Sequence, residues 1–312
     1  MTASVRTMYA MRAAGPDPGR LTGEWIPVPE PRMGEVLVEV HATAVTAGEL
    51  TWPDTWPAIP CHDVSGVVVA SGDGVTDWPA GAEVYGLIGF DRPGAAAEYV
   101  TVPVADVAAR PVAVSHEGAA ALPLGALTAW QALHEHAQLR RGQHVLVHGG
   151  AGGVGAYAVQ LAAAYGAQVT ATASARDRDF VTGLGAAEVI DYADRFEDQV
   201  GDVDVVIDPV GGDVLARSWP VLRQGGILIA IADEPDANQG GRGDVRATYF
   251  VVRPDGGRLR ELAALVDEQQ LRPAVALIFE LGDLSAAFRA QQQRPRPPGK
   301  VVIRVDRTAH VQ

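Results

Sequence analysis

The chain of 312 residues is long enough for two domains, and its 47% content of hydrophobic residues can fill a substantial core. Its formal net charge of −13 argues against nucleic acid or an anionic membrane as the main partner. A single cysteine, Cys61, excludes an intramolecular disulfide and a structural four-cysteine zinc site, and the lack of a leader-like or membrane-spanning apolar segment predicts a cytoplasmic protein.

Short strands broken by glycine and proline are predicted in the first 125 residues. Residues 34–45 alternate apolar and polar side chains, which is typical of a half-buried strand. Further short strands are predicted at 63–72, 81–88 and 96–103. This part of the chain is therefore predicted to form a β domain.

From residue 126 the pattern changes to strands that alternate with helices. A helix is predicted at 127–137 and another from Val154. Strands are predicted at 144–149, 168–173, 188–192, 204–210 and 226–232. Continuous runs of valine and isoleucine between helices indicate a parallel sheet that is covered on both faces.

The C-terminal part contains a predicted helix at 256–270 and a last strand at 299–305. Because this strand lies far from the alternating region, we assign it to the β domain. The expected organisation is an α/β protein with a β domain from residues 1–125 and 267–312. A parallel-sheet domain from residues 126–266 lies between these two segments in the sequence.

A glycine-rich turn connects the strand at 144–149 to the helix that follows. Gly150, Gly152 and Gly155 fit the pattern G-x-G-x-x-G inside a complete β-α-β unit, with Gly153 and Val154 between them. The first glycine is expected to permit the tight turn, the second to let a pyrophosphate approach, and the third to let helix and strand pack closely. The turn predicts dinucleotide binding, and the alternative is a tight β–α turn without a ligand.

The end of the second strand indicates which dinucleotide is bound. An NAD site has a carboxylate there for the ribose 2′-hydroxyl, but this strand is followed by Ser174, Arg176 and Arg178. Arginine binds phosphate through charge-assisted hydrogen bonds, so we predict NADPH. The alternative is that both arginines are solvated surface charges, diluted by Asp177 and Asp179.

Several longer motifs resemble one known family. The chain is similar to the quinone oxidoreductase, or zeta-crystallin-like, branch of the medium-chain dehydrogenase/reductase superfamily. The segments that carry the resemblance are 122–133, 145–162, 184–192, 208–212 and 299–303. The resemblance implies a GroES-like β domain made from both chain ends, with a Rossmann domain inserted.

The resemblance also implies the residues around the cofactor. Ser174, an adjacent basic side chain and Tyr192 would surround the 2′-phosphate, and Thr128 would lie near the nicotinamide amide. The nicotinamide would be lined by Val210, Ala232, Phe250 and Val252. Members of this branch commonly form homodimers through a Rossmann edge strand, and the apolar segments 225–232 and 247–252 are the candidates here.

Zinc has to be considered, because the superfamily also contains zinc alcohol dehydrogenases. A catalytic zinc needs three protein ligands, yet Thr46 stands where those enzymes have a cysteine. The consecutive residues Cys61, His62 and Asp63 point in different directions, although Glu49 could add an oxygen. We expect no metal and interpret His62 as a buried, hydrogen-bonded residue that shapes the pocket.

The expected lack of a metal restricts the chemistry. A simple ketone needs a Lewis acid or a strong proton donor, and a Tyr-x-x-x-Lys pair is impossible because the only lysine, Lys300, has no tyrosine at that spacing. A conjugated acceptor needs less help, since charge spreads from its β-carbon to an oxygen. The residues therefore predict reduction of a quinone or an α,β-unsaturated carbonyl.

The proline-rich segment 46–63 would form one wall of the substrate cleft, as the resemblance implies. Trp52 and Trp56 either stack on a planar acceptor or fasten the loop to the β domain. Thr46 could donate a hydrogen bond to the acceptor oxygen or to the cofactor. Glu49 is expected to act as a proton relay or as a salt-bridge partner.

The predicted function is thus an NADPH-dependent, zinc-independent reductase of small-molecule quinones or enones, with enoyl reductases as a related activity. Two alternatives stay open. The first is an NADPH-binding or structural protein of zeta-crystallin type without important turnover, and the second is a zinc-dependent alcohol dehydrogenase.

Overall fold

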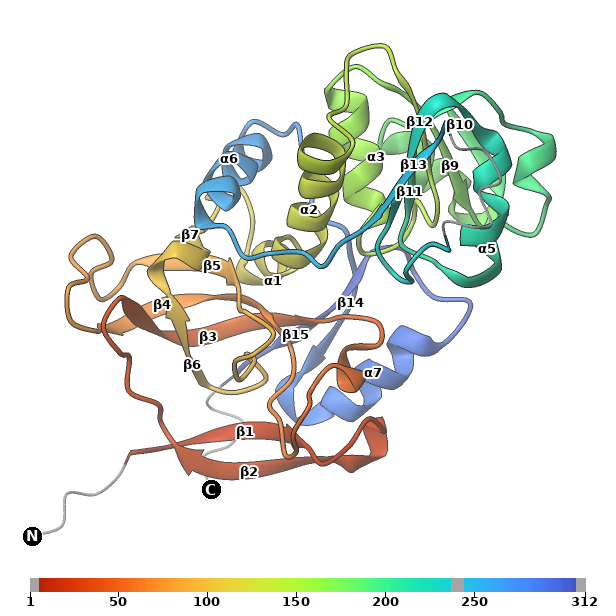
Figure 1. The fold of residues 1–312 in the computed structure, drawn as a ribbon. Helices are drawn as coiled ribbons and strands as arrows, with labels where there is room; N and C mark the ends of the chain where they lie inside the picture. Colours follow the sequence, from red (N-terminus) through yellow and green to blue (C-terminus); the bar gives the residue numbers. More distant parts are fainter. Residues whose placement is uncertain (1–5, 237–243, 307–312) are drawn as a thin grey trace, which may run out of the picture. The chain divides into compact units, whose positions relative to one another are not determined.

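The computed structural model describes residues 6–236 and 244–306, which divide into two compact units (Figure 1). One unit combines residues 1–124 with 254–312, and the other comprises residues 125–253. No helix within the described part of the chain is long and apolar enough to cross a membrane.

The first unit is built on a seven-stranded sheet in the order β14-β15-β3-β4-β5-β7, with β6 paired to β3. The strands are β3 (Glu35–Val45), β4 (Asp63–Ser71), β5 (Glu83–Leu87), β6 (Tyr99–Pro103), β7 (Val107–Ala109), β14 (Val275–Glu280) and β15 (Lys300–Arg304). A separate hairpin joins β1 (Thr7–Ala13) to β2 (Leu21–Pro27), and the helices are α1 (His116–Ala120), α6 (Gly256–Asp267) and α7 (Leu284–Gln292). Because β15 pairs antiparallel with β3, the prediction that the last strand joins the β domain is confirmed.

The second unit is a six-stranded sheet in the order β10-β9-β8-β11-β12-β13, and every neighbouring pair is parallel. The strands are β8 (His144–Val147), β9 (Gln168–Ala173), β10 (Glu188–Asp191), β11 (Val203–Asp208), β12 (Leu222–Ala230) and β13 (Arg246–Tyr249). The helices are α2 (Pro123–Trp130), α3 (Gly155–Ala164), α4 (Arg178–Gly183) and α5 (Gly212–Arg217), and α3 and α5 flank the sheet on opposite sides in Figure 1. This is the Rossmann arrangement, with its switch in strand order between β8 and β11.

The Rossmann unit ends at residue 253, whereas the sequence predicted its end at residue 266. Helix α6 belongs to the first unit, where it packs against β7. A Cβ atom on Gly256 would lie 2.4 Å from the carbonyl oxygen of Val107, and the buried Tyr85 hydroxyl donates a hydrogen bond of 2.5 Å to the carbonyl of Leu259. These contacts depend on tertiary packing, so the helical periodicity of the segment did not reveal them.

Two predicted elements of the Rossmann unit also need correction. The segment 225–232 is not at the edge of the sheet, because β12 lies between β11 and β13, and the edge strands of this sheet are β10 and β13. The helix predicted at 127–137 changes geometry within its length: α2 ends at Trp130 and continues as a π-helix from Gln131 to His136. Such π-helical turns are frequent at functional sites.

Candidate active site

The predicted cofactor residues of the Rossmann unit share one location. Since all six strands are parallel, their carboxyl ends lie at the same edge of the sheet, where doubly wound folds bind ligands. Within two or three residues of a strand end lie Gly150, Ser174, Tyr192, Val210, Ala232, Phe250 and Val252. The residues from Gly152 to Gly155 and Arg178 lie further along the segments that follow β8 and β9. Thr128 lies before the first strand of this sheet and is buried in α2.

The glycine-rich turn packs closely against the start of α3. The left-handed conformation is that of Gly149, with φ of 60°, and not of Gly150, to which the sequence analysis assigned the tight turn. Gly150 instead allows close packing, because a Cβ there would lie 2.9 Å from the Cβ of Ala171. A Cβ on Gly155 would lie 2.1 Å from the carbonyl oxygen of Gly149. No side chain caps the N-terminus of α3, so the turn fits the pyrophosphate of a dinucleotide.

The loop after β11 is held by a carboxylate that sequence reasoning missed. One oxygen of Asp208 accepts hydrogen bonds from the backbone N–H groups of Val210 (2.8 Å) and Gly211 (3.0 Å). Burial raises the pKa of Asp208, while these two bonds lower it. The arrangement fixes the loop that presents the half-exposed side chain of Val210. The sequence offered one indication of this role, because the segment 208–212 is among those that carry the family resemblance.

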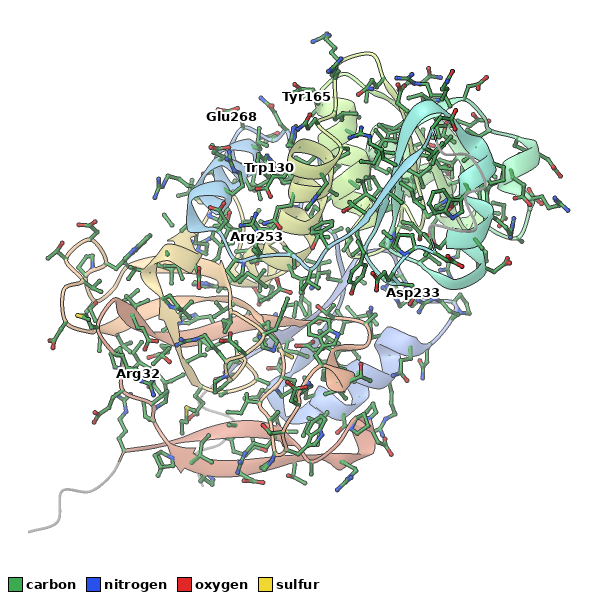
Figure 2. All side chains as sticks on the ribbon, in the orientation of Figure 1. Arg32, Trp130, Tyr165, Asp233, Arg253 and Glu268 are labelled. Carbon is green, nitrogen blue, oxygen red and sulfur yellow. The ribbon has the colours of Figure 1, made fainter. Side chains whose placement is uncertain are left out.

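The segment after β13 is held by the π-helix. The side-chain amide of Gln131 accepts from the backbone N–H of Arg253 (3.1 Å) and donates to its carbonyl (2.8 Å). The ring of His136 lies over Phe250, with centroids 4.3 Å apart. Figure 2 labels Arg253 and also Trp130 and Tyr165, whose rings both contact His134. Gln131 and His136 therefore position the predicted nicotinamide-lining residues. The sequence analysis assigned neither a role, although Gln131 lies in the segment 122–133 that carries the family resemblance.

At the end of β9 two of the predicted phosphate ligands are brought together by a third residue. The hydroxyl of Ser174 donates to Asp177 (2.7 Å), and Nε of Arg176 donates to the same carboxylate (3.2 Å). Arg178 instead donates to the backbone carbonyl of Val189. Tyr192 is 65% exposed, and its backbone N–H bonds to the carbonyl of Ala173 (2.9 Å).

In the GroES-like unit, Glu49 is a buried acceptor of two backbone hydrogen bonds. Its carboxylate oxygens accept from the N–H groups of Thr46 (2.9 Å) and Cys61 (2.5 Å), and the residue is 2% exposed. Burial raises the pKa of Glu49 to about 7, against the opposing effect of these bonds and of Lys300. Among the described residues Glu49 forms no ion pair, so of the two expected roles the salt bridge is wrong, and the proton relay stays a prediction.

A buried ion pair lies beside Thr46. Nζ of Lys300 is 2.5 Å from a carboxylate oxygen of Asp63 and donates to the hydroxyl oxygen of Thr46 (3.1 Å). Lys300 and Asp63 are 3% and 0% exposed. Because the Thr46 oxygen accepts from Lys300, its own hydrogen is left to donate elsewhere. The sequence analysis gave Lys300 no role in the site. The only lysine of the chain, at the start of an apolar strand, could have indicated a buried charge.

The two tryptophans of the segment 46–63 have different surroundings. Trp52 is 37% exposed, and its ring centroid lies 6.2 Å from that of His62 and 4.9 Å from that of Phe90. Trp56 packs against the hydrophobic core of its unit, as expected if it fastens the loop. His62 is buried, as predicted, and burial lowers its pKa against the effect of hydrogen bonds with the backbone of Ile88 and Gly89. Its Nδ1 has no hydrogen-bond partner in the described structure.

The donor groups near Thr46 do not fit a zinc ion. Asp63 is engaged by Lys300 and by the backbone N–H of Leu124, and Glu49 by two amides. The thiol of Cys61 is fully buried, and burial raises its pKa well above the ordinary value, which opposes the thiolate that zinc requires. The residues outside the gaps at 1–5, 237–243 and 307–312 contain no cluster of three or more ligands suited to a metal.

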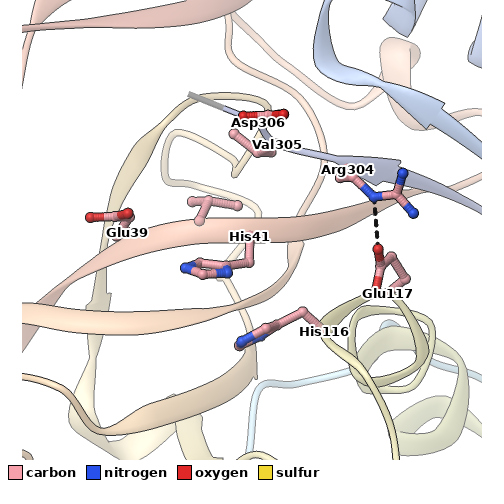
Figure 3. Close-up of a pocket in the computed structure, with 8 residues that line it drawn as sticks. Glu39, His41, His116, Glu117, Arg304, Val305 and Asp306 are labelled. Atoms are coloured by element: carbon pink, nitrogen blue, oxygen red, sulfur yellow. Dashed lines mark hydrogen bonds and ion pairs between the residues drawn. The ribbon is translucent and has the colours of Figure 1, made fainter. Parts of the chain in front are cut away.

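A separate surface pocket of about 410 Å³ lies on the GroES-like unit (Figure 3). The rings of His41 and His116 lie there at a tilt of 37° with centroids 4.4 Å apart, and Nδ1 of His116 is 2.8 Å from the hydroxyl of Ser65. Burial and the neighbouring His41 lower the pKa of His116 to about 4. None of the residues predicted for the active site lines this pocket.

Comparison with known families gives two matches in this chain. The family described as zinc-binding dehydrogenase matches residues 184–303. The family described as alcohol dehydrogenase GroES-like domain matches residues 32–112.

Two curated relatives align over most of the chain. A protein of Arthroderma benhamiae named probable zinc-binding oxidoreductase, mitochondrial, is 32% identical over 91% of this chain and 93% of its own length. The 2-methylene-furan-3-one reductase of Solanum lycopersicum is 34% identical over 89% of this chain and 74% of its own length.

Solved structures share the same fold. The quinone oxidoreductase of Coxiella burnetii superposes with a TM-score of 0.88 at 31% identity, over 96% of this chain and 100% of that one. A mycobacterial protein in complex with NADPH superposes with a TM-score of 0.85 at 29% identity, over 95% of this chain and 99% of that one.

Proposed function

Since the chain belongs to the quinone oxidoreductase-like branch of the medium-chain dehydrogenase/reductase superfamily, whose members are NAD(P)H-dependent oxidoreductases, we propose that it reduces quinones or α,β-unsaturated carbonyl compounds with NADPH and without zinc. One observation carries the proposal. The hydroxyl of Thr46, which accepts a hydrogen bond from the buried ammonium of Lys300, stands where the zinc enzymes of the superfamily have a thiolate ligand.

The residues of the GroES-like unit would serve the acceptor. NADPH, when bound, would supply the hydride, and the negative charge on the acceptor oxygen would be neutralised by a proton from water or a nearby donor. Thr46 would donate a hydrogen bond to that oxygen, and Lys300 would strengthen this donor because it already donates to the Thr46 oxygen. Glu49 would keep the turn at Thr46 in place through the backbone N–H of that residue. Trp52 and His62 would contact the planar acceptor.

The residues of the Rossmann unit would hold the cofactor. The turn from Gly150 to Gly155 would take the pyrophosphate, and Val210 with the segment 250–252 would line the nicotinamide. The preference for NADPH is supported by Ser174 and Arg176, which follow a strand that ends at Ala173 without a carboxylate.

We further propose a homodimer through strand β13, one of the two edge strands of the Rossmann sheet. Within the described part of the chain no strand pairs with the outer side of β13, so its backbone would offer hydrogen-bonding groups to a second copy. Light scattering at micromolar concentration should give twice the chain mass of 32.7 kDa, and a monomer mass would contradict this part of the proposal.

The function is tested by following NADPH oxidation with quinones, enones and simple aldehydes, before and after treatment with a chelator. We expect turnover with the first two classes and no loss of activity on chelation. Activity that chelation abolishes and zinc restores would support a zinc alcohol dehydrogenase. Stoichiometric NADPH binding without turnover of any acceptor would support the zeta-crystallin-type alternative.

Substitution of Thr46 tests the proposed donor. Thr46→Val removes the hydroxyl, and we expect kcat to fall about 100-fold, the usual effect of losing one such hydrogen-bond donor. The matched control Thr46→Ser keeps the hydroxyl and should stay within a few-fold of the parent. Steady-state kinetics with a quinone and the NADPH dissociation constant are the measurements. Equal activity of both variants would remove Thr46 from the mechanism.

A further inference from the structure

We infer that Asp177 reduces the preference of this protein for NADPH over NADH. Its carboxylate accepts hydrogen bonds from Ser174 and Arg176, the two residues proposed to bind the 2′-phosphate of NADPH. The carboxylate and the phosphate therefore compete for the same donors. The inference rests on the proposed function, since it presupposes that a dinucleotide binds at the carboxyl end of β9. It assigns a role to a residue that sequence analysis regarded only as diluting the positive charge.

The carboxylate is bound as a phosphate would be. One oxygen accepts from the hydroxyl of Ser174 (2.7 Å) and from a terminal nitrogen of Arg176 (3.4 Å), and the other accepts from Nε of Arg176 (3.2 Å). The Asp177 side chain is 13% exposed and that of Arg176 is 49% exposed. The anion is therefore the more enclosed partner of this pair, and it lies between the two donors.

Neighbouring charged groups are directed elsewhere. Asp191 accepts from the backbone N–H groups of Ala175 (3.0 Å) and Ala193 (2.9 Å), which ties the end of β10 to the segment after β9. Arg178 donates to the carbonyl of Val189. Asp177 thus contacts two of the predicted phosphate donors, Ser174 and Arg176.

The consequence differs for the two cofactors. A 2′-phosphate needs the same hydroxyl and guanidinium donors, so it must displace the carboxylate and also approach its negative charge. The ribose of NADH carries a 2′-hydroxyl there, which can donate to the carboxylate without breaking those contacts. Asp177 consequently weakens NADPH binding and is neutral or favourable for NADH binding.

The experiment compares Asp177→Asn with Asp179→Asn. The first variant keeps the shape of the side chain and removes its charge. The second variant removes an equal charge two residues further along the chain. The side chain of Asp179 is exposed and has no hydrogen bond with Ser174 or Arg176 among those described. Dissociation constants for NADPH and NADH are measured by titration for the parent and both variants. Thermal denaturation of each variant verifies folding, and Asp177→Ser replaces Asp177→Asn if the latter does not fold.

We expect Asp177→Asn to raise the ratio of NADPH to NADH affinity about tenfold, chiefly through tighter NADPH binding, and Asp179→Asn to change it less than about threefold. An unchanged or lower ratio in the Asp177 variant, or an equal rise in both variants, overturns the inference and leaves the proposed function intact. If the parent chain binds neither nucleotide, both the proposed function and the inference fail.

Discussion

Replacement of Lys300 by methionine is expected to lower the free energy of unfolding by about 3–5 kcal/mol. The substitution leaves the carboxylate of Asp63 buried, at 0% exposure, with the backbone N–H of Leu124 as its remaining hydrogen-bond donor. An uncompensated charge of this kind is costly because the protein interior cannot replace water around it. Urea denaturation at neutral pH measures the effect.

Two further variants make the result specific. Arg304→Met removes another cation from the same strand, but its ion pairs with Glu117 and Glu280 are formed by a side chain that is 47% exposed. We expect it to cost less than about 1 kcal/mol. The double variant Lys300→Met with Asp63→Leu removes both charges and should recover most of the loss. If Lys300→Met costs no more than Arg304→Met, the buried pair does not stabilise the unit.

Gly155→Ala should weaken cofactor binding about 10- to 100-fold, since moving the N-terminus of α3 would lose a hydrogen bond to the charged pyrophosphate, which contributes about 1.5–3 kcal/mol. The new Cβ would lie 2.1 Å from the carbonyl oxygen of Gly149, which is a backbone atom, so the turn or the start of α3 must move. The same crowding should cost about 1–3 kcal/mol of stability. Titration with NADPH and thermal denaturation measure the two effects separately.

The matched control is Gly183→Ala, which places the same methyl group in α4 of the same unit. Apart from the neighbouring residues and the backbone of α4 itself, no atom lies within 4 Å of its Cβ position, so we expect unchanged NADPH binding and a slight gain in stability of about 0.4–1 kcal/mol. Parent-like NADPH binding by Gly155→Ala would show that the turn does not hold the pyrophosphate.

The arrangement of elements was largely predictable from the sequence, because local patterns encode it. Period-two alternation identified β3, and apolar runs between helices identified the parallel strands from β8 to β12. We assigned the last strand to the β domain because it lies far along the chain from the alternating region. Its pairing with β3 bears this out. The glycine pattern located the turn before α3, because such turns require residues without side chains at fixed spacings.

The sequence by itself therefore determined the two kinds of sheet and the edge at which the predicted cofactor residues gather. Only the tertiary structure decided which side chains meet. Lys300 and Asp63 are 237 positions apart, and no periodicity links them. Side-chain direction likewise decides that Ser174 and Arg176 contact Asp177. Packing decides that α6 belongs to the GroES-like unit. Local sequence sets backbone geometry, whereas contacts between distant residues are fixed only when the elements pack into a common core.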